Sequence, residues 1–217
     1  MKKAFRRNII NEHISKSTGV LHLGAHAGQE AGSYFNLNKS VIWVEAIPHV
    51  YEKLVCNIEK FNNQQAFCAL ITDTDNQSYT FNVSNNTGGV SSSIYEFGDY
   101  SSGKNSLWPG LNLTMVDKID LISITLDTLA LKNNFNTAQY DFWVLDLQGA
   151  ELLALKGAEQ SIKNCKYILS EISQAEVYKN GVLYSDLKRF LEAKGFFPLY
   201  EPKKIHDDVL FVKINNR

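Results

Sequence analysis

A short apolar segment that ends in a glycine turn is the feature that most constrains this fold. Residues 20–23 have the composition of a buried strand, and Gly24 follows them directly. A residue without Cβ lets the backbone turn sharply beside a ligand, and a following helix presents free N–H groups there. A second apolar run ends in Glu45, 21 positions after Gly24. An acidic residue about 20 positions after such a turn binds ribose hydroxyls. The segment therefore predicts a strand, turn and helix that bind an adenosine-type nucleoside.

The spacing of the glycines separates the candidate nucleosides. The dinucleotide fingerprint needs a glycine where this chain has His26, because the backbone there closes on a pyrophosphate. S-adenosylmethionine has no pyrophosphate, so the looser turn from Gly24 to Gly28 suits it better than NAD. A purely structural turn between a strand and a helix is the alternative interpretation.

Length and charge exclude several classes of protein. The 217 residues suffice for one well-buried α/β domain, so we expect a single domain over residues 1–217. The 22 basic and 23 acidic residues are scattered along the chain, which disfavours nucleic-acid binding. No signal peptide or apolar run long enough to span a membrane is present, which predicts a soluble cytoplasmic protein. The three cysteines lack metal-ligand spacing and are expected to be reduced packing residues.

Short apolar runs alternate with amphipathic segments, which is typical of a mostly parallel sheet with helices on both faces. We expect strands near 20–23, 41–45, 66–71, 140–145, 166–171 and 207–213, and helices near 28–37, 49–61, 149–163 and 184–194. Residues 1–18 are expected to form an N-terminal helical extension. The runs 195–200 and 208–213 predict a C-terminal antiparallel hairpin, typical of Rossmann-like methyltransferases.

The stretch 72–125 breaks this rhythm. Residues 79–83 alternate like a half-exposed strand, and the Ser/Gly/Asn-rich segment after them has the composition of a loop. Because a long loop in a compact domain is functional or disordered, we expect 84–115 to be a substrate or lid loop. Tyr100, Trp108 and Pro109 are its candidate contacts, with surface packing as the alternative.

A second chemical centre follows the strand near 140–145, which delivers Asp146 to its carboxyl end. Ligands of open α/β sheets bind beyond the carboxyl ends of the strands, so Asp146 is expected to share a cleft with Glu45. Helix capping by Asp146 is the alternative, and both roles can coexist. The next strand ends in Glu171, and His206 opens the final strand, so three polar clusters are expected at one edge.

In its ordered motifs the chain resembles the FkbM family of S-adenosylmethionine-dependent methyltransferases. The matching segments are 23–30, 44–46 with Pro48, Tyr51 and Glu52, then 91–93, 125–127, 146–151, 155–158, 170–171 and 206–212. The resemblance implies an α/β, Rossmann-like class I fold with a mostly parallel seven-stranded sheet. It also implies O-methylation of a hydroxyl group, with a sugar nucleotide or a glycan of surface or capsular polysaccharide synthesis as the expected acceptor.

The resemblance assigns the cofactor site to the two strand ends. Glu45 is expected to bind the ribose, residues 68–70 to line the adenine pocket, and residues 24–30 to surround the methionine. The expected cofactor-binding residues are Gly24, Ala25, His26, Gly28, Gln29, Glu30, Glu45, Ala46, Ala69, Asp146 and Gln148. His22 departs from the family pattern, because such enzymes commonly carry an acidic residue there. Asp146 and Glu30 are then the available anions for the methionine ammonium.

Methyl transfer to a hydroxyl requires removal of its proton. His206 is the leading candidate base, because the unperturbed pKa of imidazole is closest to the working pH, and a solvated loop histidine is the rival interpretation. His26 is a second candidate. Glu171 and Asp146 are expected to act as base or to orient it, or to hold Mg²⁺ or Mn²⁺, although spacing alone establishes no metal site.

Two other functions compete with this interpretation. An NAD-dependent oxidoreductase of nucleotide sugars is disfavoured by His26 within the glycine turn and by the terminal hairpin. A non-catalytic Rossmann-like subunit is disfavoured by the carboxylates Glu45, Asp146 and Glu171 at three strand ends, since a structural fold does not need them. The oligomeric state cannot be predicted from the sequence.

Overall fold

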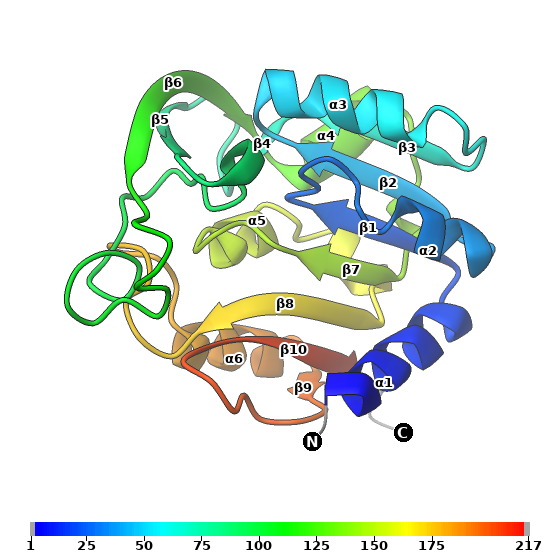
Figure 1. Ribbon diagram of the computed structural model, residues 1–217. Helices are drawn as coiled ribbons and strands as arrows, with labels where there is room; N and C mark the ends of the chain where they lie inside the picture. Colours follow the sequence, from blue (N-terminus) through cyan, green and yellow to red (C-terminus); the bar gives the residue numbers. More distant parts are fainter. Residues whose placement is uncertain (1–2, 215–217) are drawn as a thin grey trace.

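A seven-stranded sheet forms the centre of the molecule (Figure 1). The computed structural model describes residues 3–214. The strands lie in the order β3-β2-β1-β7-β8-β10-β9. Their bounds are β1 (Gly19–Leu23), β2 (Ser40–Glu45), β3 (Gln64–Cys68), β7 (Phe142–Leu145), β8 (Tyr167–Ser173), β9 (Phe196–Pro198) and β10 (His206–Lys213). All neighbours are parallel except β10, which is antiparallel to both β8 and β9. The predicted mostly parallel sheet with a C-terminal antiparallel hairpin is confirmed.

Helices cover both faces of this sheet. One face carries α1 (Lys3–Lys16), α2 (Ala31–Asn36) and α3 (Pro48–Ile58), and the other carries α4 (Leu126–Lys132), α5 (Glu151–Lys156) and α6 (Tyr184–Ala193). Strands β1 and β7 are buried along their whole length, because side chains on both faces meet helices. Within residues 3–214, no helix has the length and apolar character needed to cross a membrane.

A small second sheet explains the irregular middle of the chain. Strands β4 (Leu70–Ile71), β6 (Met115–Ile124) and β5 (Ser78–Ser84) lie in the order β4-β6-β5. Strand β5 matches the predicted strand at 79–83, whereas the sequence pattern does not predict β6 or α4. The connection from β5 to β6 carries the short 3-10 helix η1 (Thr87–Gly89). Phe97 and Leu113 of this connection form an apolar cluster with Val177 and Tyr178 of the loop after β8.

Four local predictions need correction. The strand expected at 66–71 divides into β3 and β4. The helix expected at 149–163 ends at Lys156 and is followed by the 3-10 helix η3 (Ser161–Asn164). A Cβ on Gly157, which follows this helix, would lie 2.0 Å from the carbonyl oxygen of Thr72. The backbone at Thr72 therefore leaves no room for a side chain at the position where the helix ends. The expected start of β7 at 140 shifts to Phe142, because η2 (Thr137–Gln139) precedes it.

All three cysteines are free, but only Cys165 is buried, so the predicted packing role is wrong for Cys56 and Cys68.

Candidate functional site

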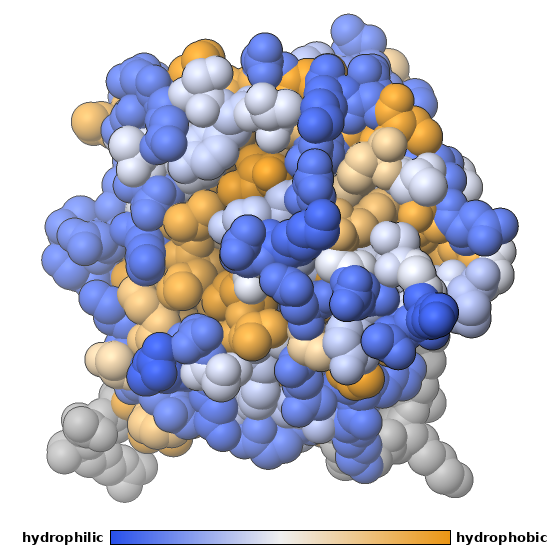
Figure 2. Space-filling model, turned by 90° about the vertical axis from the view of Figure 1, so that its left-hand side faces the viewer, coloured by the Kyte–Doolittle hydropathy of each residue, from blue (hydrophilic) through white to orange (hydrophobic). Residues whose placement is uncertain are grey.

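A cavity of about 440 Å³ lies at the carboxyl ends of β1, β2, β7 and β8. These strands meet at the point where the sheet order reverses between β1 and β7, which is where ligands bind in open α/β sheets. Figure 2 shows this side of the molecule, with apolar side chains near its centre and hydrophilic ones around them. The pocket is lined by ten of the residues predicted to bind cofactor: Gly24, Ala25, His26, Gln29, Glu30, Glu45, Ala46, Ala69, Asp146 and Gln148.

Gly24 allows two strand ends to come together. Its φ of 79° lies in the left-handed region, and a Cβ there would lie 1.9 Å from the carbonyl oxygen of Asp146. The backbone N–H of Asp146 donates to the carbonyl oxygen of Leu23 at 3.0 Å. The glycine therefore lets the turn after β1 lie directly against the turn after β7. Gly28 has a different role, since a Cβ there would lie 2.6 Å from the side chain of Leu54, and it does not line the pocket.

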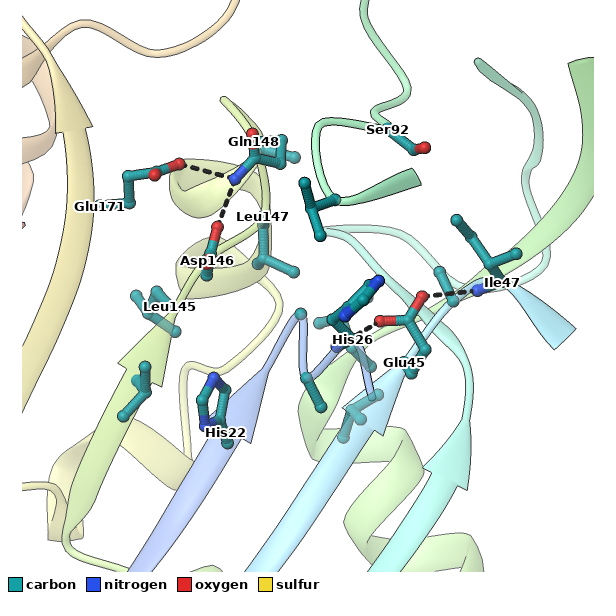
Figure 3. A pocket seen from close by; sticks show the side chains of 18 of the residues that line it. His22, His26, Glu45, Ile47, Ser92, Leu145, Asp146, Leu147, Gln148 and Glu171 are labelled. Atoms are coloured by element: carbon teal, nitrogen blue, oxygen red, sulfur yellow. Dashed lines mark hydrogen bonds between the residues drawn. The ribbon is translucent and has the colours of Figure 1, made fainter. Parts of the chain in front are cut away.

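Glu45 is held in place by the backbone around it (Figure 3). Its Oε2 accepts from the N–H of His26 at 2.8 Å, and its Oε1 accepts from the N–H of Ile47 at 2.9 Å. Burial raises the pKa of Glu45, and these two bonds to the charged form oppose the shift. A carboxylate oxygen has two lone pairs, so both oxygens can still accept from ribose hydroxyls.

The His26 ring joins the glycine turn to η1. Its Nε2 donates to the carbonyl oxygen of Gly88 at 3.1 Å, because that oxygen can only accept. The Nδ1 atom must then accept from the side-chain amide of Gln29 at 2.7 Å. Both ring nitrogens are occupied, so the prediction of His26 as a second base is not supported by the geometry.

His22 is a neutral group in the wall of the pocket. Its side chain stacks on Trp43 with the ring centroids 4.9 Å apart, and its Nδ1 lies 3.3 Å from the hydroxyl of Tyr34. Burial lowers the pKa of His22 to about 3. Because the imidazole is uncharged, it cannot replace an acidic residue as partner of an ammonium group. Asp146 and Glu30 both line the same pocket.

Gln148 connects the two carboxylates of the second centre (Figure 3). Its side-chain nitrogen donates to Oδ1 of Asp146 and, at 2.7 Å, to Oε2 of Glu171. The amide oxygen of Gln148 accepts from the hydroxyl of Tyr178, which fixes the orientation of the amide. The sequence predicts Gln148 as a pocket residue, but no sequence signal points to its contact with Tyr178.

Glu171 extends this network to His206. Its Oε1 lies 2.8 Å from Nε2 of His206, whose Nδ1 lies 3.0 Å from the hydroxyl of Ser173. Glu171 lines the pocket, whereas His206 lies behind it and meets the ring of Trp108 edge-on, with the centroids 5.2 Å apart. Among the predicted loop contacts, Tyr100 and Trp108 pack in the apolar cluster around Phe97 and Leu113. Residues 69 and 70 line the cavity as predicted, but Cys68 does not.

Burial sets the protonation of this region. It raises the pKa of Asp146 well above its ordinary value and that of Glu171 to about 8, and the charges of neighbouring carboxylates add to both shifts. Burial also lowers the pKa of His206. The pair of Glu171 and His206 therefore carries one proton and no net charge at neutral pH.

Glu151, not Asp146, stabilises the turn into α5. Its Oε1 accepts from the N–H groups of Leu147 at 2.9 Å and Gly149 at 3.2 Å. The residue before the helix is Ala150, so the alternative in which Asp146 caps the helix is wrong. In the part of the chain that the structure describes, no three His, Cys, Asp or Glu side chains gather to hold a metal ion. The oxygens of Asp146 and Glu171 are instead bridged by an amide, which is a donor and not a metal ligand in this orientation.

The strand order, the glycine turn and the pocket at the strand ends define a Rossmann-like methyltransferase fold. Residues 22–198 match the model of the methyltransferase FkbM domain, and the chain belongs to this family. No match was found among curated proteins.

Several solved structures are similar to this chain at low sequence identity. EvdMO1 is similar with a TM-score of 0.51 and 14% identity, covering 97% of this chain and 40% of that chain. The 1,6-didemethyltoxoflavin-N1-methyltransferase of Burkholderia thailandensis has a TM-score of 0.49 and 10% identity, covering 96% and 76%. Magnesium protoporphyrin IX methyltransferase of Synechocystis PCC 6803 has a TM-score of 0.47 and 8% identity, covering 95% and 77%.

Proposed function

We propose that this protein is an S-adenosylmethionine-dependent O-methyltransferase that acts on a sugar hydroxyl, in a sugar nucleotide or a glycan of surface or capsular polysaccharide synthesis. The observation that carries the proposal is the network from Asp146 through Gln148 and Glu171 to His206 at the wall of the pocket. A methyltransferase that acts on a hydroxyl needs an acceptor for the hydroxyl proton, and this network supplies one. We place the reaction in the cytoplasm and in a single domain.

The pocket residues suit the proposed cofactor. Glu45 faces the cavity with free lone pairs for the ribose hydroxyls, and the apolar side chains of Ile47, Ala69 and Leu70 provide a surface for adenine. The turn from Gly24 to Glu30 would surround the methionine part, with Asp146 and Glu30 as partners of its ammonium group. When bound, the cofactor supplies an electrophilic methyl group on a sulfonium.

The residues of the network have distinct roles in the proposed reaction. In this reaction the acceptor oxygen would take the methyl group from the bound cofactor, and the electron pair of the S–C bond would stay on sulfur. The hydroxyl proton passes to Glu171 at the pocket wall, and His206 behind it shares that proton through its Nε2. Gln148 keeps the Asp146 and Glu171 carboxylates apart and oriented. Positioning of this kind supplies several kcal/mol of barrier lowering.

Methyl transfer can be tested directly with a labelled methyl donor. The purified protein is incubated with a panel of sugars, oligosaccharides and sugar nucleotides, and the product is analysed by mass spectrometry and NMR. We expect one labelled methyl group on an oxygen atom and release of S-adenosylhomocysteine. His206→Ala should lower turnover by about 10²-fold or more while the affinity for S-adenosylhomocysteine stays within about twofold. A label on nitrogen or carbon, or an unchanged turnover in His206→Ala, would contradict the proposal.

A further inference from the structure

We infer that the acceptor group that enters this pocket carries no phosphate, and that the acceptor is an uncharged or amine-bearing glycan and not a nucleotide-linked sugar. This inference rests on the proposed function and decides between the two acceptor classes that it contains. We assign the selection against phosphate-bearing acceptors to Asp208.

The side chains that line the cavity include carboxyl groups but no permanent cation among the described residues. Five carboxylate side chains face it, from Glu30, Glu45, Asp146, Glu171 and Asp208, and no lysine or arginine of the described chain is among the lining residues. A diphosphate site needs the opposite arrangement, with arginine or lysine donors or a row of backbone N–H groups. A neutral polyol suits this pocket because it brings no negative charge near the carboxyl groups, and the sulfonium and ammonium groups of the proposed cofactor are positively charged.

Neither histidine in the wall offers a free cationic nitrogen to a phosphate. The imidazole of His22 is neutral, since burial among Trp43 and Tyr34 opposes protonation. Both ring nitrogens of His26 are already bonded, to Gly88 and Gln29. Neither ring can therefore act as a cationic partner for a phosphate.

Asp208 lines the pocket beside Glu171. It lies on β10 directly opposite Glu171 of β8 in the antiparallel register. Its side chain is exposed and lines the cavity. Its backbone N–H bonds Asp207, but within residues 3–214 no hydrogen bond or ion pair involves its own carboxylate. A free carboxylate at a pocket wall is available to accept from hydroxyl or ammonium donors and repels anions.

The basic residues near Asp208 do not offset this charge. Arg6 pairs with Asp207 at 2.6 Å and lies over the ring of Tyr200, 4.7 Å from its centroid. Lys203 and Lys204 are exposed on the loop before β10 and do not line the cavity. A phosphate inside the pocket would meet Asp208 and the uncharged pair of Glu171 and His206, with no lysine or arginine of the described chain beside it.

Nucleotide binding to the cofactor-loaded protein tests this inference even before the acceptor is identified. UDP and GDP are titrated into protein saturated with S-adenosylhomocysteine, using wild type, Asp208→Asn and the control Asp117→Asn. Asp117 is exposed on β6 and does not line the pocket, so it reports the same charge change elsewhere. We expect neither wild type nor Asp117→Asn to bind UDP or GDP saturably below about 1 mM. Asp208→Asn should bind these nucleotides at least about fivefold more tightly than wild type, because removal of one screened charge at close range has an effect of about this size.

The outcomes separate the two proposals. Saturable binding of UDP or GDP to wild type below about 1 mM would overturn the inference, and so would an Asp208→Asn variant that binds them no better than Asp117→Asn. Failure of S-adenosylhomocysteine to saturate the protein would instead contradict the proposed function itself. In the methyl-transfer assay, free or amino sugars should react faster than the same sugars linked to UDP, and the reverse order would also overturn the inference.

Discussion

The Nε2 atom of His206 lies 2.8 Å from Oε1 of Glu171, and the two side chains respond to burial in opposite directions. Burial raises the pKa of Glu171 to about 8 and lowers the pKa of His206. One proton is therefore shared between a carboxyl and an imidazole. The pair of Glu171 and His206 can accept a proton from a substrate hydroxyl only after this shared proton has dissociated.

Turnover should consequently rise with pH through the pKa of Glu171. Below about pH 8 the pair holds its proton and the network cannot accept another, and above that pH it is free. We expect kcat to increase severalfold between about pH 6.5 and 8.5 in steady-state assays at saturating cofactor. In Glu171→Gln the acid limb should move to lower pH, because the raised pKa of Glu171 no longer sets it. A wild-type profile that is flat across this range would contradict the shared proton.

Removal of the Glu45 carboxylate should weaken cofactor binding. We expect Glu45→Ala to raise the dissociation constant of S-adenosylhomocysteine at least tenfold, about 1.4 kcal/mol, in a calorimetric titration. The same change leaves the N–H groups of His26 and Ile47 without partners, so a lower melting temperature is also expected. Glu52→Ala is the matched control, because Glu52 is exposed on α3 and does not line the pocket. Binding by Glu45→Ala as tight as in the control would refute the role.

The buried His22 should make the protein sensitive to acid. The unfolded chain protonates this histidine at an ordinary pKa of 6.5, whereas the folded protein does so only at about 3. The unfolded state therefore binds more protons between these values, and the contribution to stability is lost as pH falls from 6.5. Between about pH 6.5 and 4.5 it amounts to about 2–3 kcal/mol.

Burial raises the pKa of other groups, such as the carboxyl of Glu151, and these groups also make stability depend on pH. The contribution of His22 is therefore measured as the difference between wild type and a variant without this histidine. The free energy of unfolding is determined by urea titration for wild type and His22→Gln at several pH values. The difference between the two should change by about 2–3 kcal/mol in favour of the variant at the lower pH. A difference that does not vary with pH would show that His22 has the same pKa in the folded and unfolded states, which contradicts the lowered value.

Substitution of Gly24 should be far more damaging than substitution of Gly32. A Cβ at position 24 would overlap the carbonyl oxygen of Asp146 and require a positive φ. Gly24→Ala is expected to lower the free energy of unfolding by more than about 3 kcal/mol. At Gly32, within α2, a Cβ meets nothing within 4 Å, so Gly32→Ala should raise stability by about 0.5–1 kcal/mol. Equal thermal stability of the two variants would contradict the described turn.

The carboxyl ends of the strands in the main sheet can be predicted, because in the sequence each follows a short apolar run. Apolar runs lead directly into Gly24, Glu45 and Asp146, and the parallel sheet then brings these ends to one edge. Strand β6 is not predictable in this way. Its residues alternate between charged and apolar with little burial, and its pairing with β5 decides its conformation more than its composition does.

The finer geometry of the site cannot be predicted from the spacing of residues, because it depends on contacts between side chains that are distant in the sequence. The hydroxyl of Tyr178 comes from a loop 30 residues beyond Gln148, and its bond to the amide oxygen helps to fix which way the Gln148 amide faces. His26 is a reasonable base candidate until both of its ring nitrogens are accounted for. Gly28 belongs to the turn motif, yet its neighbour is Leu54 of α3 and not the cavity.

Calorimetric titration with S-adenosylhomocysteine, with NAD in a parallel cell, tests the central claim most directly. The pocket lacks any cationic partner for a pyrophosphate among the described residues and presents Glu45 to a ribose. We predict micromolar binding of S-adenosylhomocysteine, about −8 kcal/mol, and no binding of NAD. Binding of NAD in its place would contradict the assignment of the cofactor, and binding of neither would contradict the assignment of this pocket to a nucleoside.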